Sequence, residues 1–300
     1  MGWVRNEPRV CRTYFGASQS RRSAQTEIKD MFLGTILRRG LSIGEIPPTP
    51  TEQQLNLSLT EPKKILLEAA SEYGFPISFI QEQNGALIQN IFPIRKTEEQ
   101  QISTSSKTEL ALHTEAAFHP YKPKVVLLLC LRGDPNAVTT YANIDDIVER
   151  LKPETLSTLT QLWFTTSIDE SFRTNGEKDM ELTCSVLKEV VNDDSNRRDS
   201  KTDPVYTICY DETLTKGINE QAVEALRELK EAIRECTSQV VLETGDLLVL
   251  NNDTTVHGRL PFKARYDGTD RWIQRILAIQ TLPPRDHLDG LVITTRFGQF

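Results

Sequence analysis

The chain has 300 residues, a formal net charge of −7, and hydrophobic and charged shares of 38% and 26%. These values are those of an ordinary globular protein that can bury one large core. The acidic balance argues against a nucleic-acid surface, and the longest apolar run, residues 125–131, is too short to span a bilayer. We therefore expect a small-molecule partner, with no nucleic acid and no membrane.

Five cysteines are scattered along the chain without a C-x-x-C pair. Such a set fits neither a disulfide framework nor a zinc ribbon, which predicts a reducing, cytoplasmic setting. We interpret residues 1–30 as a divergent and poorly ordered extension. The alternative is an organelle transit peptide, because the first 25 residues hold five arginines against one glutamate.

In the first half of the chain, short apolar segments are separated by turn signals. A helix is expected to open at Thr60, Glu61 and Pro62 and to end near Gly74. A second helix is expected to begin after Asn143, because asparagine commonly caps helix N-termini. The expected strands are residues 31–40, 76–80, 85–92, 125–131 and 161–166.

The second half begins with residues 192–204, which carry no large apolar side chain and predict a solvated loop, either a lid or an insertion. Residues 218–236 then predict an amphipathic helix. Its apolar stripe is interpreted as core packing and consists of Val223, Leu226, Leu229 and Ile233. Further strands are expected at residues 205–210, 238–243, 247–252 and 271–281. Many short strands without regular βα alternation predict a mainly β fold, a sandwich or jelly-roll core with helical decoration.

Just ahead of the longest apolar run, the segment "LALHTEAAFHP" places His113 and Glu115 two positions apart. In an extended segment, residues i and i+2 point to the same side, so both side chains can reach one metal ion. Two imidazoles and one carboxylate can hold a redox-active iron and leave coordination positions open. Taken alone the pair is a weak signal, and a solvated turn is the alternative interpretation.

The second histidine of such a site would be His257, which follows a predicted β-hairpin in "GDLLVLNNDTTVHGRLPF". The chain has four histidines in all. We interpret His119 as a packing or polar neighbour and His287 as part of a surface turn. The candidate metal ligands are therefore His113, Glu115 and His257.

Two arginines, Arg271 and Arg275, are separated by an even number of residues in the last long predicted strand. They therefore share one face with Ile273, and this face should point inward. Buried guanidinium groups are costly unless anions satisfy them, and their planar geometry suits carboxylates. We expect a cavity that binds organic acids; the alternative is that both arginines pair with Asp267, Asp270 or other acidic side chains at a strand edge.

The segments "HTEAAFHPYKP", "GDLLVLNN", "VHGRLPF" and "RYDGTDRWIQR" resemble the clavaminate synthase-like branch of the TauD/TfdA superfamily. The resemblance runs from about residue 32 to residue 282, and the order and spacing of its motifs are specific. Members of this branch are Fe(II)- and 2-oxoglutarate-dependent oxygenases that hydroxylate free amino acids. The resemblance implies a double-stranded β-helix, or jelly roll, as a single domain over residues 31–300, with a lid within residues 165–205.

The same resemblance implies roles for the matching residues. His113, Glu115 and His257 fall on the iron ligands, which are also the catalytic residues. Arg271, with Thr140 as its companion, falls on the site for the distal carboxylate of 2-oxoglutarate. Arg275 falls on the residue that binds the α-carboxylate of the substrate.

The implied reaction hydroxylates a free L-amino acid at C3 or C4, with O2 as oxidant and 2-oxoglutarate decarboxylated to succinate. Asp211 and Asp169 lie about where arginine hydroxylases place carboxylates against the guanidinium, which favours lysine or arginine. Alternatives are cyclisation or desaturation of an elaborated amino acid, and a catalytically silent jelly-roll binding protein. A zinc hydrolase could use the same three ligands but has no need for paired arginines. A monomer or a homodimer is expected.

Overall fold

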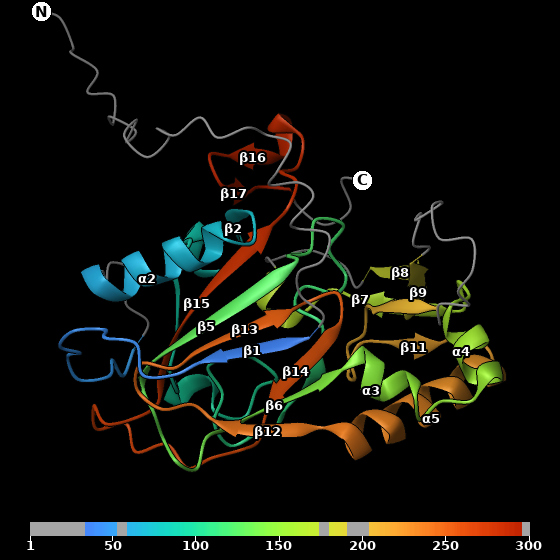
Figure 1. The fold of residues 1–300 in the computed structure, drawn as a ribbon, viewed down its shortest axis with the longest axis horizontal. Helices are drawn as coiled ribbons and strands as arrows, with labels where there is room; N and C mark the ends of the chain where they lie inside the picture. Colours follow the sequence, from blue (N-terminus) through green and yellow to red (C-terminus); the bar gives the residue numbers. More distant parts are fainter. Residues whose placement is uncertain (1–33, 53–58, 174–179, 191–203, 296–300) are drawn as a thin grey trace, which may run out of the picture. The chain divides into compact units, whose positions relative to one another are not determined.

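The computed structural model describes residues 34–52, 59–173, 180–190 and 204–295. The predicted extension over residues 1–30 and nearly all of the predicted loop over residues 192–204 lie outside this part of the chain. Within it, the fold is mainly β with few helices (Figure 1), as the strand-rich pattern predicts. No described helix has the length and apolar character needed to cross a bilayer.

The larger sheet has eight described strands in the order β1-β13-β5-β15-β2-β17-β16, and β3 also pairs with β15. Neighbours are antiparallel except β17 and β2, which are parallel. The central strands β5 and β15 are buried almost throughout, because both faces of the sheet are covered. The strands are β1 (Thr35–Arg38), β2 (Phe75–Phe79), β3 (Gln89–Ile91), β5 (Val125–Arg132), β13 (Leu247–Asn251), β15 (Trp272–Ile279), β16 (Leu288–Asp289) and β17 (Val292–Ile293).

A second sheet of four strands, in the order β12-β6-β14-β4, carries part of the site described below. Its strands are β4 (Leu110–His113), β6 (Val138–Asn143), β12 (Ser238–Val241) and β14 (Thr255–Arg259). Alternate side chains of β5 and β15, such as Leu128 and Ile273, form a core cluster against which Tyr141 and Val240 of the smaller sheet pack. The main core therefore includes side chains from both sheets.

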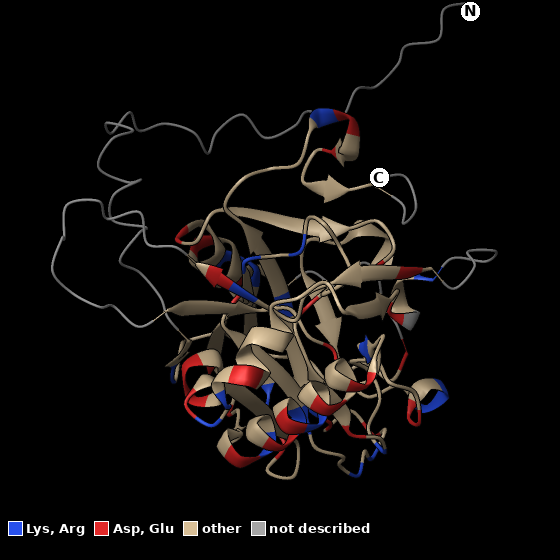
Figure 2. Ribbon diagram, turned by 90° about the vertical axis from the view of Figure 1, so that its right-hand side faces the viewer, with Lys and Arg blue, Asp and Glu red and all other residues tan. Residues whose placement is uncertain are grey.

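The helices cover the sheets from outside. Helix α2 (Thr60–Ser71) packs on β5 and β15 through buried residues such as Leu66. Helix α5 (Glu220–Cys236) packs with α3 (Ile144–Val148) and α4 (Pro153–Leu159) around a second core cluster. Short strands complete this region: β7 (Phe164–Ser167), β8 (Glu181–Cys184), β9 (Leu187–Val190), β10 (Val205–Ile208) and β11 (Lys216–Gly217). Acidic and basic residues are interspersed along the helices (Figure 2).

Two local predictions differ from the structure. The α5 stripe buries Leu229 and Ile233, but Val223 is 56% exposed, because the helix turns a face of small residues toward the core. That face contains Ala222, Ala225 and Ala232. Asn143 does precede α3, but its side chain caps no helical N–H group and instead accepts hydrogen bonds from Thr35 and Thr255.

Candidate active site

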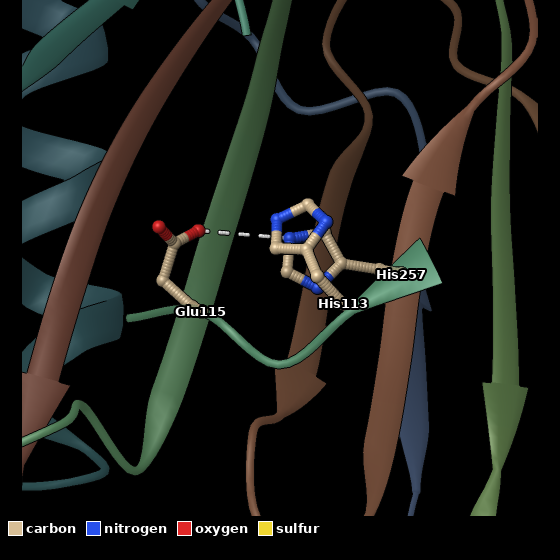
Figure 3. Close-up of side chains that lie close together, drawn as sticks. All are labelled: His113, Glu115 and His257. Atoms are coloured by element: carbon tan, nitrogen blue, oxygen red, sulfur yellow. Dashed lines mark ion pairs between the residues drawn. The ribbon is translucent and has the colours of Figure 1, made fainter. Parts of the chain in front are cut away.

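Three candidate metal ligands come together where β4 and β14 lie side by side. His113, the last residue of β4, is the register partner of His257 on β14, and their ring centroids are 4.5 Å apart. Glu115 follows β4 by two residues and turns its carboxylate toward both imidazoles (Figure 3). The potential ligand atoms of the three side chains all lie within 4.8 Å of one another.

The backbone that carries Glu115 is fixed by a fully buried amide, Asn252. Its Oδ1 accepts from the Glu115 N–H at 2.7 Å, and its Nδ2 donates to the carbonyls of Glu115 and Pro123 at 3.0 and 2.8 Å. The neighbouring Thr114 exchanges two hydrogen bonds with the backbone of Tyr210. Contacts within the protein therefore place Glu115 in the site before any ligand binds.

The donor atoms suit a divalent metal. Nδ1 of His113 lies 2.8 Å from the Ala111 carbonyl, which favours the tautomer with a proton on Nδ1 and leaves the Nε2 lone pair free. Oε2 of Glu115 is buried, has no hydrogen-bond partner among the described residues, and lies 3.6 Å from Nε2 of His257. A carboxylate oxygen and two imidazole nitrogens converging in this way fit iron(II) bound on one face.

The charge states of these groups agree with metal binding. Burial opposes ionisation of Glu115, but Arg275 and the two histidines outweigh it and hold the pKa of this carboxyl well below its usual range. Burial, followed by the nearby His113, lowers the pKa of His257 and so favours its neutral form. Deprotonated carboxylate and neutral imidazole are the forms that bind metals.

Arg275 of β15 connects the metal ligands to the rest of the cavity. Its guanidinium donates to Oε1 of Glu115 at 2.8 Å, to Oε1 of Glu82 at 2.6 Å and to Oε1 of Gln89 at 2.7 Å. Because Oε1 of Glu115 is occupied in this way, the other carboxylate oxygen is left to face the histidines. Burial raises the pKa of Glu82, whereas its pairing with Arg275 opposes this shift.

Arg271 lies on the same cavity wall as Arg275, as their spacing predicts, but in different surroundings. The side chain is buried, and its one hydrogen bond to a described side chain is a long one, 3.4 Å, to Oγ1 of Thr139. No described carboxylate lies within ion-pair distance of its guanidinium, and burial lowers its pKa. A buried guanidinium without a counter-ion is a site for an anion.

The predicted companion of Arg271, Thr140, is displaced by one residue in the structure. Thr139 lines the cavity and contacts Arg271, and the alternation along β6 turns Thr140 to the opposite side. The Thr140 hydroxyl instead lies against Gly258 of the neighbouring strand. Among the described residues it is therefore Thr139, and not Thr140, whose hydroxyl contacts Arg271.

Asp211 and Asp169 both line the cavity. Oδ1 of Asp211 accepts from the backbone of Thr213 and Leu214 and from the Thr213 hydroxyl, at 2.7–2.9 Å. Oδ1 of Asp169 accepts from the backbone and hydroxyl of Ser171. Each aspartate uses one oxygen to fix a turn, and neither Oδ2 makes a hydrogen bond to a described residue.

Comparison with known proteins agrees with this geometry. Residues 58–277 match the family model described as taurine catabolism dioxygenase TauD, TfdA family. The chain belongs to the TauD/TfdA family. The resemblance inferred from the sequence motifs is thereby confirmed.

Three proteins illustrate the similarity of this TauD/TfdA member to others. An L-asparagine oxygenase from Streptomyces coelicolor is 35% identical over 83% of this chain and 72% of that protein. An L-lysine 3-hydroxylase from Catenulispora acidiphila is 31% identical over 90% of this chain and 74% of that protein. A solved structure of asparagine oxygenase with Fe(II), 2S,3S-3-hydroxyasparagine and succinate matches with a TM-score of 0.77 and 33% identity, covering 92% and 84% of the two chains.

Three further residues of this TauD/TfdA chain line or border the cavity and were not predicted. Glu82 and Gln89 bind Arg275 from segments far away in the sequence. Arg259 of β14 is 3% exposed, and burial, with Arg271 nearby, lowers its pKa to about 9. Its position two residues after His257 on the same strand is the signal that could have placed it in the cavity.

Proposed function

We propose that this chain is an Fe(II)- and 2-oxoglutarate-dependent oxygenase that hydroxylates a free L-amino acid with a cationic side chain, lysine or arginine, at C3 or C4. The observation that carries the proposal is one cavity in which His113, Glu115 and His257 converge beside two buried arginines, Arg271 and Arg275. The named activities of the similar proteins support hydroxylation of a free amino acid, and that of the L-lysine 3-hydroxylase supports a cationic side chain.

We also propose the finer architecture that the family resemblance implies. Residues 31–300 form one domain with a double-stranded β-helix core, and a lid lies within residues 165–205. The two facing sheets support the first part of this proposal. Of the proposed lid, Asp169, Ser171 and Phe172 lie at the cavity. The cytoplasmic setting stays a prediction from the cysteines, and the four cysteines in the described part of the chain are free. A monomeric or homodimeric state also stays a prediction.

Iron held by His113, Glu115 and His257 would supply the oxidising chemistry, with O2 as oxidant and 2-oxoglutarate converted to succinate. The protein's part is to bind and orient the two organic reactants. Arg271, aided by the Thr139 hydroxyl, would bind the distal carboxylate of 2-oxoglutarate and so fix the direction in which this molecule points.

The amino acid would bind between Arg275 and Glu82. These two side chains pair directly at 2.6 Å in the structure. A zwitterion that inserts between them places its α-carboxylate on the guanidinium and its α-ammonium on Glu82, so that every charge keeps a partner. This geometry selects a free amino acid, because an N-acylated one cannot offer the cation that Glu82 requires.

The side chain of the substrate would then reach Asp211 and Asp169. The Oδ2 atoms of both carboxylates are available to bind an ammonium or guanidinium group. Placement of the substrate relative to the iron would decide whether C3 or C4 reacts, since the pocket determines which C–H bond faces the oxidant.

The test is to supply anaerobically purified protein with Fe(II), 2-oxoglutarate and oxygen, together with each free L-amino acid. Succinate and a product heavier by one oxygen atom are measured, with His257→Ala as control. Stimulation by lysine or arginine, absent with their N-acetyl forms and in the control, supports the proposal. Stimulation by asparagine alone would refute the cationic substrate, and turnover that no free amino acid stimulates would point to an elaborated amino acid. No iron binding and no turnover would indicate a silent binding protein.

A further inference from the structure

Arg259 is a second buried cation without a counter-ion in the same cavity as Arg271. It is 3% exposed, and Arg271 is 7% exposed. The guanidinium donates to the Ser105 hydroxyl at 2.8 Å and to two backbone carbonyls, those of Leu260 and Thr108, at 2.9 and 3.2 Å. All three acceptors are neutral, and the buried Nε has no acceptor among the described residues.

The strand register places the two arginines next to each other. Arg259 on β14 is paired directly opposite Thr139 on β6, so the two side chains share one face of the sheet. Thr139 accepts a hydrogen bond from Arg271. His257, two residues before Arg259 on the same strand, points to this face as well. Arg259 therefore belongs to the end of the cavity that Arg271 and Thr139 form.

Arg275 differs from Arg259 and Arg271 in having carboxylate partners within the protein. Arg275 has two carboxylate partners, Glu115 and Glu82. No described carboxylate lies within ion-pair distance of Arg259 or Arg271, although each is buried. Burial, with the charge of Arg271 nearby, lowers the pKa of Arg259, and the more distant Asp134 offsets the effect of burial on the pKa of Arg271 only in part. Burying two like charges is costly unless an anion compensates them. A single guanidinium would suffice to orient one carboxylate, so the presence of a second guanidinium at this end of the cavity requires an explanation.

We propose that Arg259 is a second cation of the site for the distal carboxylate, and that it makes this enzyme select a 2-oxo acid with a distal carboxylate over one without. The inference rests on the proposed function and deepens it, because it names a residue that determines cosubstrate choice. The orphaned Nε of Arg259 and the absence of a described counter-ion for either arginine carry the argument.

A purely structural role makes a different prediction. Through Ser105 and Thr108, Arg259 also ties the segment before β4 to β14. The nearby residues 101–103 of this segment line the cavity. If anchoring this segment were the only role of Arg259, its loss would weaken the binding of all 2-oxo acids by the same factor. Ser105→Ala removes one anchoring contact and leaves the charge in place, so it is the matched control.

The experiment measures binding of 2-oxoglutarate and of 2-oxopentanoate to the full chain loaded with Mn(II), by calorimetry. 2-Oxopentanoate has the same carbon chain with a methyl group in place of the distal carboxylate. For Arg259→Gln we expect about ten- to a hundredfold weaker binding of 2-oxoglutarate, as for loss of a hydrogen bond to a charged group, and little change for 2-oxopentanoate. Arg259→Lys should restore part of the preference, and Ser105→Ala should leave it unchanged.

Each outcome separates the two claims. Preference of the unmodified protein for 2-oxoglutarate supports the proposed function, and its absence refutes that function whatever the variants do. With that preference established, equal losses for both 2-oxo acids in Arg259→Gln, or none, would overturn the role of Arg259. If Arg259→Gln fails to fold by circular dichroism, Arg259→Lys decides: a preference for 2-oxoglutarate that is kept in full or in part, relative to the Ser105→Ala control, supports the role of the charge, and loss of the preference overturns it.

Discussion

At the scale of single residues, Asn252 shows how a side chain outside the chemistry can determine the metal site. Its amide satisfies three backbone groups around Glu115 and Pro123, all of them buried. Asn252→Ala leaves these groups unpaired, at about 1–3 kcal/mol each before relaxation. We expect a lower free energy of unfolding by roughly 3 kcal/mol and weaker Mn(II) binding, because the Glu115 carboxylate is no longer held toward the histidines.

Denaturant unfolding and a Mn(II) titration measure the two effects. Leu229→Ala is the control, because it removes a buried side chain in helix α5 and leaves the loop of Glu115 intact. It should lose a comparable free energy of unfolding and keep its metal affinity. Equal metal affinity in Asn252→Ala and Leu229→Ala would show that the amide stabilises the fold without positioning the ligand.

Sequence spacing could predict which residues lie near each other only within a single extended segment. Arg271 and Arg275 were predicted to share an inward face, and they line one cavity. Glu82 was out of reach of such reasoning, because its contact with Arg275 spans 193 positions and depends on how β2 and β15 pair. The contact of Arg271 with Thr139 and not with Thr140 has the same cause. Which of two successive strand residues points toward the cavity depends on how the strands pair in the folded protein.

At the scale of elements, long apolar runs were sufficient to predict β5 and β13, because strands buried on both faces read as nearly continuous hydrophobic segments. Strand β15 was predicted from the apolar residues that surround Gln274 and Arg275. Strands β6 and β14 were missed as strands, since their sequences, VTTYAN and TVHGR, are polar and carry cavity residues on one face. These two short strands line a polar site and therefore lack the apolar pattern by which a strand is recognised.

Helix α5 offers a matched pair of substitutions on one element. Leu229 is fully buried, whereas Val223, predicted to belong to the same stripe, is 56% exposed. Leu229→Ala should therefore lower the free energy of unfolding by about 2–5 kcal/mol, and Val223→Ala should change it by less than roughly 0.5 kcal/mol. Urea unfolding measures both, and equal losses would mean that the helix packs through the stripe predicted from its sequence.

At the scale of the whole molecule, the site exists only in the folded chain, because its residues come from β4 and the segment after it, from β14 and from β15. Ligands that bind only the folded state stabilise it by mass action, by about 2.7 kcal/mol at a hundred times the dissociation constant. For a domain of this size we expect Mn(II) at that level to raise Tm by roughly 5–10 °C. A chelator should reverse the shift.

Addition of 2-oxoglutarate should raise Tm further, because its distal carboxylate would pair with the buried guanidinium of Arg271, which has no described carboxylate within ion-pair distance. Two variants, followed by differential scanning calorimetry, separate the contributions. His257→Ala should abolish the shift due to Mn(II), and Arg271→Gln should retain that shift and lose most of the additional one. A Mn(II) shift that survives in His257→Ala would place the metal elsewhere in the protein, and an undiminished 2-oxoglutarate shift in Arg271→Gln would remove this arginine from the cosubstrate site.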